Sequence, residues 1–131
     1  MTPTLHDITG EIVDAAGKIH VALGPGLLES FCKRVLAHEL TRRGLRVERQ
    51  ATRPVTFNGV TFERGVRVDL IVEDRVIVEI KSREYLNPIH ARQLLTYLRV
   101  LNLPVGLLIN FGRETLRQGL RRVVNNYQRE S

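Results

Sequence analysis

The stretch VRVDLIVEDRVIVEIK, residues 66–81, contains two runs rich in valine and isoleucine around a short polar segment. This composition predicts two antiparallel strands, residues 66–72 and 76–80, joined by a turn at Glu73-Asp74-Arg75. Every even position in the two runs is apolar. Because alternate side chains of a strand point to opposite faces, the sequence predicts that this one face of both strands is core.

Three charged residues interrupt the apolar character of this stretch. A three-residue turn places Asp69 opposite Glu79 and puts Lys81 on the same face, whereas a two-residue turn would break that register. Paired carboxylates repel by up to about 1 kcal/mol when exposed, and by more when buried. A divalent metal would resolve the repulsion, and Lys81 would then stabilise charge on a bound phosphate or help to activate the attacking water. The alternative is a salt bridge between Lys81 and one of the carboxylates on a solvent-facing sheet.

The rest of the chain supplies helices around these strands. Before the two strands, the sequence predicts a helix over about 7–23, a helix from Leu27 to a cap at Gly44, a strand or extended lead-in at 45–50, and hairpin strands at 55–57 and 60–62 around Asn58-Gly59. After them, it predicts a helix from Asn87-Pro88 to Leu101, a strand at 105–109 and a basic helix over 113–124. This order predicts a single domain, residues 1–131, of α/β (α+β) class with a mixed β-sheet flanked by helices.

The net charge, the apolar runs and the cysteine count of the chain favour some classes of protein and exclude others. The chain has 131 residues and a formal net charge of +6, which favours a polyanionic partner such as nucleic acid. No apolar run is long enough to span a bilayer, and the N-terminus does not resemble a secretory signal, so no membrane partner is expected. The single cysteine, Cys32, excludes an intramolecular disulfide and favours a reducing, cytoplasmic location.

Asp69 followed by Glu79-Ile80-Lys81 resembles the signature of the PD-(D/E)xK nuclease superfamily, and the whole chain resembles its small GxxExxY branch. The matching stretches are LGPGLLES at 23–30, GVRVDLIVEDRVIVEIKS at 65–82, HARQLLTYLRV at 90–100 and VGLLINFG at 105–112. The resemblance implies a restriction-endonuclease-like core. Two positions depart from it: Cys32 replaces the tyrosine that gives the branch its name, and Val68 replaces the proline of the superfamily name.

The resemblance also implies roles for individual residues. It implies metal ligation by Glu29, Asp69, Glu79 and the Ile80 carbonyl, a catalytic set of Asp69, Glu79, Lys81 and Gln93, and a nucleic-acid contact by Tyr97. Glu29 has an alternative explanation, because an acid in the first turn of a helix is favoured by the helix dipole. Gln93 and Tyr97 also have one, since they share a helix face next to an apolar stripe and could edge the core.

Three arginines recur at four-residue spacing in the predicted last helix, namely Arg113, Arg117 and Arg121. They would form either a strip that binds phosphates or a solvated helix face. The same two alternatives apply to the arginines that end the second helix and flank the first hairpin, Arg42, Arg43, Arg53 and Arg64.

These observations predict a nuclease dependent on Mg²⁺ (or Mn²⁺) that hydrolyses phosphodiester bonds in nucleic acid, DNA rather than RNA. A homodimer or a larger assembly is compatible with the small size of the chain. The alternative is a non-catalytic module of the same fold that binds nucleic acid or a protein partner, because a fold alone does not determine a function.

Overall fold

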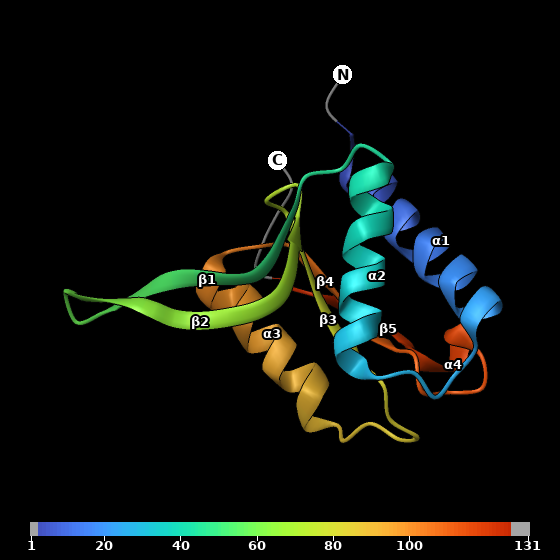
Figure 1. Ribbon diagram of the computed structural model, residues 1–131. Coiled ribbons are helices and arrows are strands. Elements are labelled where there is room, and N and C mark those ends of the chain that lie inside the picture. Colours follow the sequence, from blue (N-terminus) through green and yellow to red (C-terminus); the bar gives the residue numbers. More distant parts are fainter. Residues whose placement is uncertain (1–2, 127–131) are drawn as a thin grey trace.

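The computed structural model describes residues 3–126, which form a five-stranded sheet with helices on both faces (Figure 1). The elements are α1 (Leu5–Leu23), α2 (Glu29–Arg42), β1 (Val47–Phe57), β2 (Val60–Val72), β3 (Val76–Lys81), α3 (Ile89–Leu101), β4 (Val105–Asn110), α4 (Leu116–Gly119) and β5 (Leu120–Val124). The strands lie in the order β1-β2-β3-β4-β5, with β3 and β4 parallel and the other neighbours antiparallel. The predicted α+β class with a mixed sheet is therefore confirmed.

Two apolar clusters hold the layers together. One joins α1 and α2 to the sheet through residues such as Ile12, Leu36 and Val78, and the other joins α3 to the opposite face through Leu94 and Leu98. Figure 1 shows α1 and α2 side by side, with α3 on the other side of the strands. Among residues 3–126, no helix has the length and apolar character needed to cross a membrane.

The helix ends follow the sequence signals closely. α1 begins at a capping box: Thr4 Oγ1 accepts a hydrogen bond from the Asp7 N–H, and Asp7 Oδ2 accepts one from the Thr4 N–H, both at 3.0 Å. Gly44 has a φ of 89°, so the glycine predicted to end α2 does adopt a left-handed conformation. α3 begins at Ile89 with Pro88 in the cap position, and Asn87 Oδ1 accepts a hydrogen bond from the Ile89 N–H at 2.9 Å.

The predicted basic helix over 113–124 is wrong. Only the single turn α4 is helical there, and the chain continues as β5, which pairs antiparallel with β4. The residues of β4 are all buried, and β5 provides hydrogen-bonding partners along the edge of β4 that β3 does not occupy. The arginine spacing of this segment is helical, but the unpaired edge of a buried strand decided its structure.

The prediction of one apolar face along both strands holds for only part of β2. Leu70 and Val72 pack in the cluster of α1 and α2, as predicted, but Val66 and Val68 pack in the cluster of α3. The change of side occurs at Asp69, opposite Gln50 of β1, which has a φ of 50° and forms no ladder pair, although the register is the same on either side of it. The alternating apolar residues of β2 could not predict this change of side, because their pattern gives a single core face only when the strands are regular.

The two predicted hairpin strands at 55–57 and 60–62 are the outer end of one long hairpin formed by β1 and β2. Asn58 and Gly59 both have positive φ and form its turn, as predicted. Three residues of β2, 63–65, lie opposite the single Pro54 of β1, which lacks the N–H needed for regular pairing. Figure 1 shows the outer part of this hairpin extending away from the helices; we call residues 50–67 the arm.

Candidate active site

Asp69 and Glu79 face each other where the ladder between β2 and β3 ends. The register Leu70–Val78, Ile71–Ile77 and Val72–Val76 confirms the three-residue turn and puts Asp69 opposite Glu79. Each carboxylate then accepts a hydrogen bond from the other strand: Glu79 Oε2 from the Asp69 N–H at 2.7 Å, and Asp69 Oδ2 from the Ile80 N–H at 2.8 Å. These two hydrogen bonds fix both carboxylates just beyond the last backbone pair of β2 and β3.

The closeness of the two carboxylates changes the protonation of Glu79. Burial and the neighbouring charge of Asp69 raise the pKa of Glu79 from 4.5 to about 7, and the positive charge of Lys81 opposes this rise only in part. In the metal-free site Glu79 therefore keeps a proton to higher pH than an ordinary glutamate does. A perturbed carboxyl pair with a lysine two residues further on is the arrangement expected of a reactive site.

Helix α2 brings a third carboxylate and a lysine to the same place. Lys33 Nζ lies 3.0 Å from Asp69 Oδ1 and 3.4 Å from Glu29 Oε2, so that one ammonium group joins Glu29 to Asp69. Burial lowers the pKa of Lys33, but the bonds and charges of Asp69 and Glu29 outweigh this effect and give a net rise. Glu29 thus lies near the pair, and its contact with Asp69 runs through Lys33.

Helix α3 approaches the pair from the other face of the sheet. Burial and the negative charges of Glu79 and Asp69 raise the pKa of Tyr97, which places this phenol within their electrostatic reach. Gln93 is exposed one turn earlier on the same side of α3. In the first turn of α3, burial and the positive charges of Lys81 and Arg83 lower the pKa of His90, whereas Glu29 acts in the opposite direction.

Hydrogen bonds and ion pairs therefore join Glu29, Lys33, Asp69 and Glu79, and Lys81 and Tyr97 interact electrostatically with this cluster. A family model described as the PD-(D/E)XK nuclease superfamily matches residues 6–123. The chain belongs to the PD-(D/E)XK nuclease superfamily. Neither the comparison with curated proteins nor the comparison with solved structures gives a significant match.

In this PD-(D/E)XK superfamily member, the donor set fits a hard divalent cation. Asp69 and Glu79 offer carboxylate oxygens, and the Lys33 ammonium already lies as a cation between Asp69 and Glu29. Over residues 3–126, no group of three or more His, Cys, Asp or Glu side chains is arranged to hold an ion by itself. Mg²⁺ commonly completes its coordination with water and substrate phosphate, so two carboxylates are sufficient for such a site.

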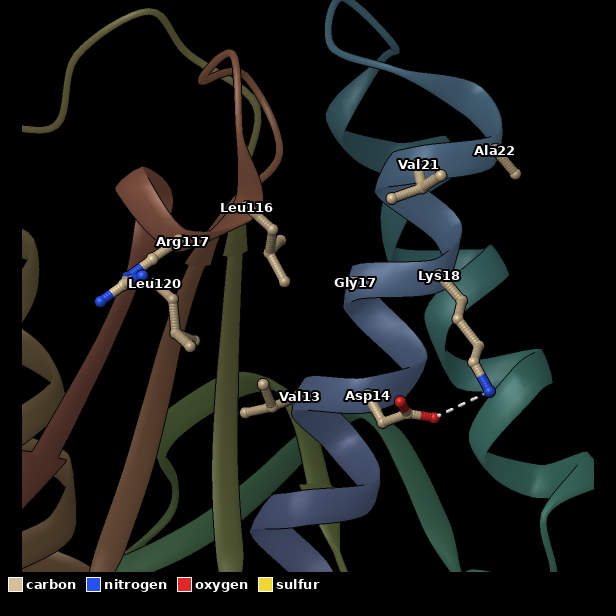
Figure 2. A pocket seen from close by; sticks show the side chains of 9 residues that line it. All are labelled: Val13, Asp14, Gly17, Lys18, Val21, Ala22, Leu116, Arg117 and Leu120. Atoms are coloured by element: carbon tan, nitrogen blue, oxygen red, sulfur yellow. Dashed lines mark ion pairs between the residues drawn. The ribbon is translucent and has the colours of Figure 1, made fainter.

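The three predicted phosphate-binding arginines do not form one strip. Arg113 and Arg121 line a pocket of about 160 Å³ with Tyr85 and Asn110, and the Arg113 guanidinium lies 5.3 Å from the Tyr85 ring centroid. Arg117 lines a different pocket, of about 570 Å³, between α1 and the α4–β5 segment (Figure 2). This separation follows from the turn and strand that replace the predicted helix, because Arg113 precedes α4, Arg117 lies within α4 and Arg121 lies on β5.

The pocket in Figure 2 is mostly apolar and contains none of the carboxylates of the candidate active site. Its polar members Asp14 and Lys18 are paired with each other at 3.2 Å. We therefore place no chemistry there.

Sequence reasoning missed Lys33, which contacts Asp69 directly, and did not include His90 in the site. The signal for Lys33 was available, because Glu29 and Lys33 are four residues apart and so share one helix face. The contact of Lys33 with Asp69 was not available, since it joins residues 36 positions apart in the sequence. His90 gave no such signal; only the packing of α3 places it near Lys81 and Glu29.

Proposed function

We propose that this chain is a metal-dependent nuclease that hydrolyses phosphodiester bonds in nucleic acid, DNA rather than RNA. The observation that carries the proposal is the Asp69–Glu79 pair, fixed by its crossed hydrogen bonds with Lys81 two residues further on. Membership of a nuclease superfamily supports it.

In the proposed mechanism, Asp69, Glu79 and the Ile80 carbonyl hold Mg²⁺ or Mn²⁺, and Glu29 adds negative charge beside them. A divalent cation at this position supplies Lewis-acid polarisation of the scissile phosphate. The Lys81 ammonium stabilises the negative charge that develops on the phosphoryl oxygens, or holds the attacking water by a hydrogen bond. Both tasks require the charge of Lys81 to lie close to Glu79. The lowering effect of Lys81 on the pKa of Glu79 supports this requirement.

The remaining residues position the reactants. Gln93 orients the attacking water or Lys81 from its exposed site on α3, and Tyr97 contacts the nucleic acid close to the carboxylates. Arg113 and Arg121, which share one pocket near the start of α3, contact the backbone of the substrate. Arg117, which lies in the pocket of Figure 2, is left out of this set.

We also propose that the chain belongs to the GxxExxY branch of the superfamily, because of the four stretches given above, and that its location is cytoplasmic, because its single cysteine favours a reducing compartment. The missing tyrosine is the main departure: Cys32 is buried in the core beside α1, and burial raises the pKa of its thiol. A homodimer or a larger assembly remains a prediction.

The first experiment is calorimetric titration of Mg²⁺ and Mn²⁺ into the wild type and into an Asp69→Ala, Glu79→Ala double variant. Wild-type binding that the variant loses is the expected result, because both carboxylates are then absent. No binding by the wild type, even with a short oligonucleotide present to supply phosphates, would overturn the metal-dependent proposal.

Lys81→Ala tests the catalytic step. We expect cleavage of a labelled DNA strand or duplex to fall by about 10²-fold or more, since a cation that stabilises the transition state is lost. Metal binding and thermal unfolding should change little. The control is Lys18→Ala on α1, whose ammonium forms an exposed pair with Asp14, and it should cleave at the wild-type rate. Wild-type cleavage by a folded Lys81→Ala protein would refute the role of Lys81.

One observation favours the non-catalytic alternative. In the metal-free state Lys33 neutralises Asp69, and a raised pKa lets Glu79 hold a proton, so the carboxylates are satisfied without a divalent cation. A module that binds nucleic acid or a protein partner could keep this arrangement for stability alone. The titration above separates the two functions, because the module predicts no metal binding in either variant.

A further inference from the structure

The arm, residues 50–67, carries charge that the proposed mechanism does not use. It contains the arginines Arg53, Arg64 and Arg67 and a single acid, Glu63. Arg53 is neutralised by two hydrogen bonds to Glu48, at 2.8 and 3.0 Å. Arg64 and Arg67 are exposed, and neither has an ion pair with any acid among residues 3–126. The arm therefore presents two cations that nothing in the described part of the chain neutralises.

These two arginines share one surface. Gln50, Thr52, Arg64 and Arg67 line a shallow pocket of about 480 Å³, which we call the basic face of the arm. Regular alternation would put Arg64 and Arg67 on opposite sides of β2. The bulge of residues 63–65 against Pro54 changes this, and Arg64 joins Arg67 on the same face.

The basic face continues into the carboxylate pair. Val66 and Val68 pack toward α3, so Arg67 between them points to the opposite face, the one on which Asp69 contacts Lys33 of α2. Arg67 and Asp69 are two residues apart on β2, a separation of about 6.6 Å along a strand. Side chains at this spacing are neighbours, so a phosphate next to the carboxylate pair would have Arg67 beside it.

The basic face also answers an electrostatic requirement. Three carboxylates, those of Glu29, Asp69 and Glu79, surround the position of the scissile phosphate and repel a polyanion. Cations placed along the approach to such a site offset this repulsion and steer the ligand. Arg64 and Arg67 are positioned for this role, and a two-stranded ribbon is a shape that nucleic-acid grooves accept.

We propose that the basic face of the arm binds the backbone phosphates of a nucleic-acid strand next to the carboxylate pair. The proposal rests on the proposed function for the class of ligand, but not for catalysis. It assigns the main backbone contact to Arg64 and Arg67 of the arm, at the opposite edge of the sheet from Arg121 on β5.

The test is fluorescence anisotropy with a short labelled DNA duplex and with the corresponding single strand, in EDTA so that no cleavage occurs. We expect Arg64→Ala, Arg67→Ala to bind about tenfold more weakly at moderate salt, and the slope of log affinity against log salt to fall by about two, one for each phosphate contact. The control is Arg99→Ala, Arg122→Ala, which removes the same charge from exposed positions on α3 and β5 and should keep the wild-type slope.

A second variant tests the other face of the arm. Phe57 and Phe62 are 69% and 54% exposed and share a face with Val55 and Val60 in the hairpin register. Phe57→Ser, Phe62→Ser should bind with the wild-type salt slope. An unchanged slope for the double arginine variant, or a loss of binding confined to the phenylalanine variant, would overturn the proposal.

The outcomes separate this proposal from the proposed function. A double arginine variant that loses DNA binding but keeps calorimetric Mn²⁺ binding places the defect in the arm and not in the carboxylate pair. A wild type that binds DNA through the arm yet never cleaves it would refute the nuclease proposal and leave this one standing.

Discussion

The inner and outer halves of β2 carry similar charges in opposite surroundings. In the inner half, residues 66–72, Asp69 lies between two helices and has hydrogen bonds or ion pairs to Glu79, Ile80 and Lys33. In the outer half, residues 60–65, Glu63 and Arg64 are exposed on the arm. The same strand thus holds one charge that the fold must compensate and others that water solvates.

This difference predicts a reactive site in the inner half of β2 and a surface for electrostatic binding in the outer half. A buried charge must be neutralised by a partner or by a proton, and this requirement shifts pKa values and prepares a site for a metal or a reaction. An exposed charge keeps its ordinary behaviour and acts through attraction, which salt weakens. The comparison predicts large, pH-dependent effects for the inner half and small, salt-dependent effects for the outer half.

The largest effect concerns Glu79 in the metal-free protein. The pKa of Glu79 rises from 4.5 to about 7 on folding, so the folded state holds a proton that the unfolded state loses between these values. The stabilisation is therefore complete below pH 4.5 and is lost as the pH rises through 7. We expect the free energy of unfolding to fall by at most about 3 kcal/mol over this window.

Urea unfolding in EDTA at a series of pH values measures this loss. Glu79→Gln should flatten the profile, since no proton can then be taken up at this position. Glu63→Gln, in the exposed outer half, should leave the profile as in the wild type. An equal slope in Glu79→Gln and wild type would show that other groups cause the dependence.

The second effect concerns Lys33. The side chains of Lys33 and Asp69 are only 21% and 14% exposed, so removing the ammonium leaves carboxylates unpaired in a poorly solvated site. We expect Lys33→Ala to lower the free energy of unfolding of the metal-free protein by about 2 kcal/mol. Mn²⁺ should bind more tightly in calorimetry, because no ammonium competes for Asp69 Oδ1.

Lys18→Ala is the matched control for Lys33. Lys18 pairs with Asp14 at the same i,i+4 spacing as Lys33 with Glu29, but the side chains of Lys18 and Asp14 are 74% and 53% exposed, and we expect a change below about 0.5 kcal/mol. Weaker Mn²⁺ binding by Lys33→Ala would contradict the idea that the ammonium occupies the position of a metal ion.

The smallest effect concerns the bend of the arm. A Cβ added at Gly65 would lie 2.6 Å from Cγ2 and 2.7 Å from Cβ of Val55, so Gly65→Ala forces the two strands apart at the bulge. We expect a loss of about 1 kcal/mol in thermal unfolding and weaker DNA binding. Gly10→Ala, in α1 with no atom within 4 Å of the new Cβ, should instead stabilise the protein slightly. A Gly65→Ala arm that binds DNA as the wild type does would show that its bend is not needed.

The local signals were sufficient for most elements and for the central pair. Runs of β-branched residues, the Asn58-Gly59 turn and the three-residue turn predicted the strands and the register that sets Asp69 opposite Glu79. This works because hairpin register depends on turn length and side-chain period, which are local properties. The roles of Asp69, Glu79, Lys81 and Gln93 remain predictions that the experiments above address.

Signals of the same kind failed where a distant partner decided the structure. The spacing of Arg113, Arg117 and Arg121 is helical, yet the free edge of β4 draws this segment into β5. The apolar alternation of β2 is regular, yet a left-handed Gln50 across the ladder moves Val66 and Val68 to the side of α3. The sequence of β5 gives no sign of the free edge of β4, and the sequence of β2 gives no sign of the left-handed conformation of Gln50 in β1.

By itself, then, the sequence determined most of the elements and the pairing of two carboxylates, since each depends on residues near one another in the chain. Only the tertiary structure decided that Lys33 joins Glu29 to Asp69, that Tyr97 and His90 lie within reach of these charges, and that Arg64 and Arg67 share a face. These arrangements depend on how α2, α3 and the bent hairpin pack against each other. Packing is set by side chains far apart in the chain, so no local pattern records it.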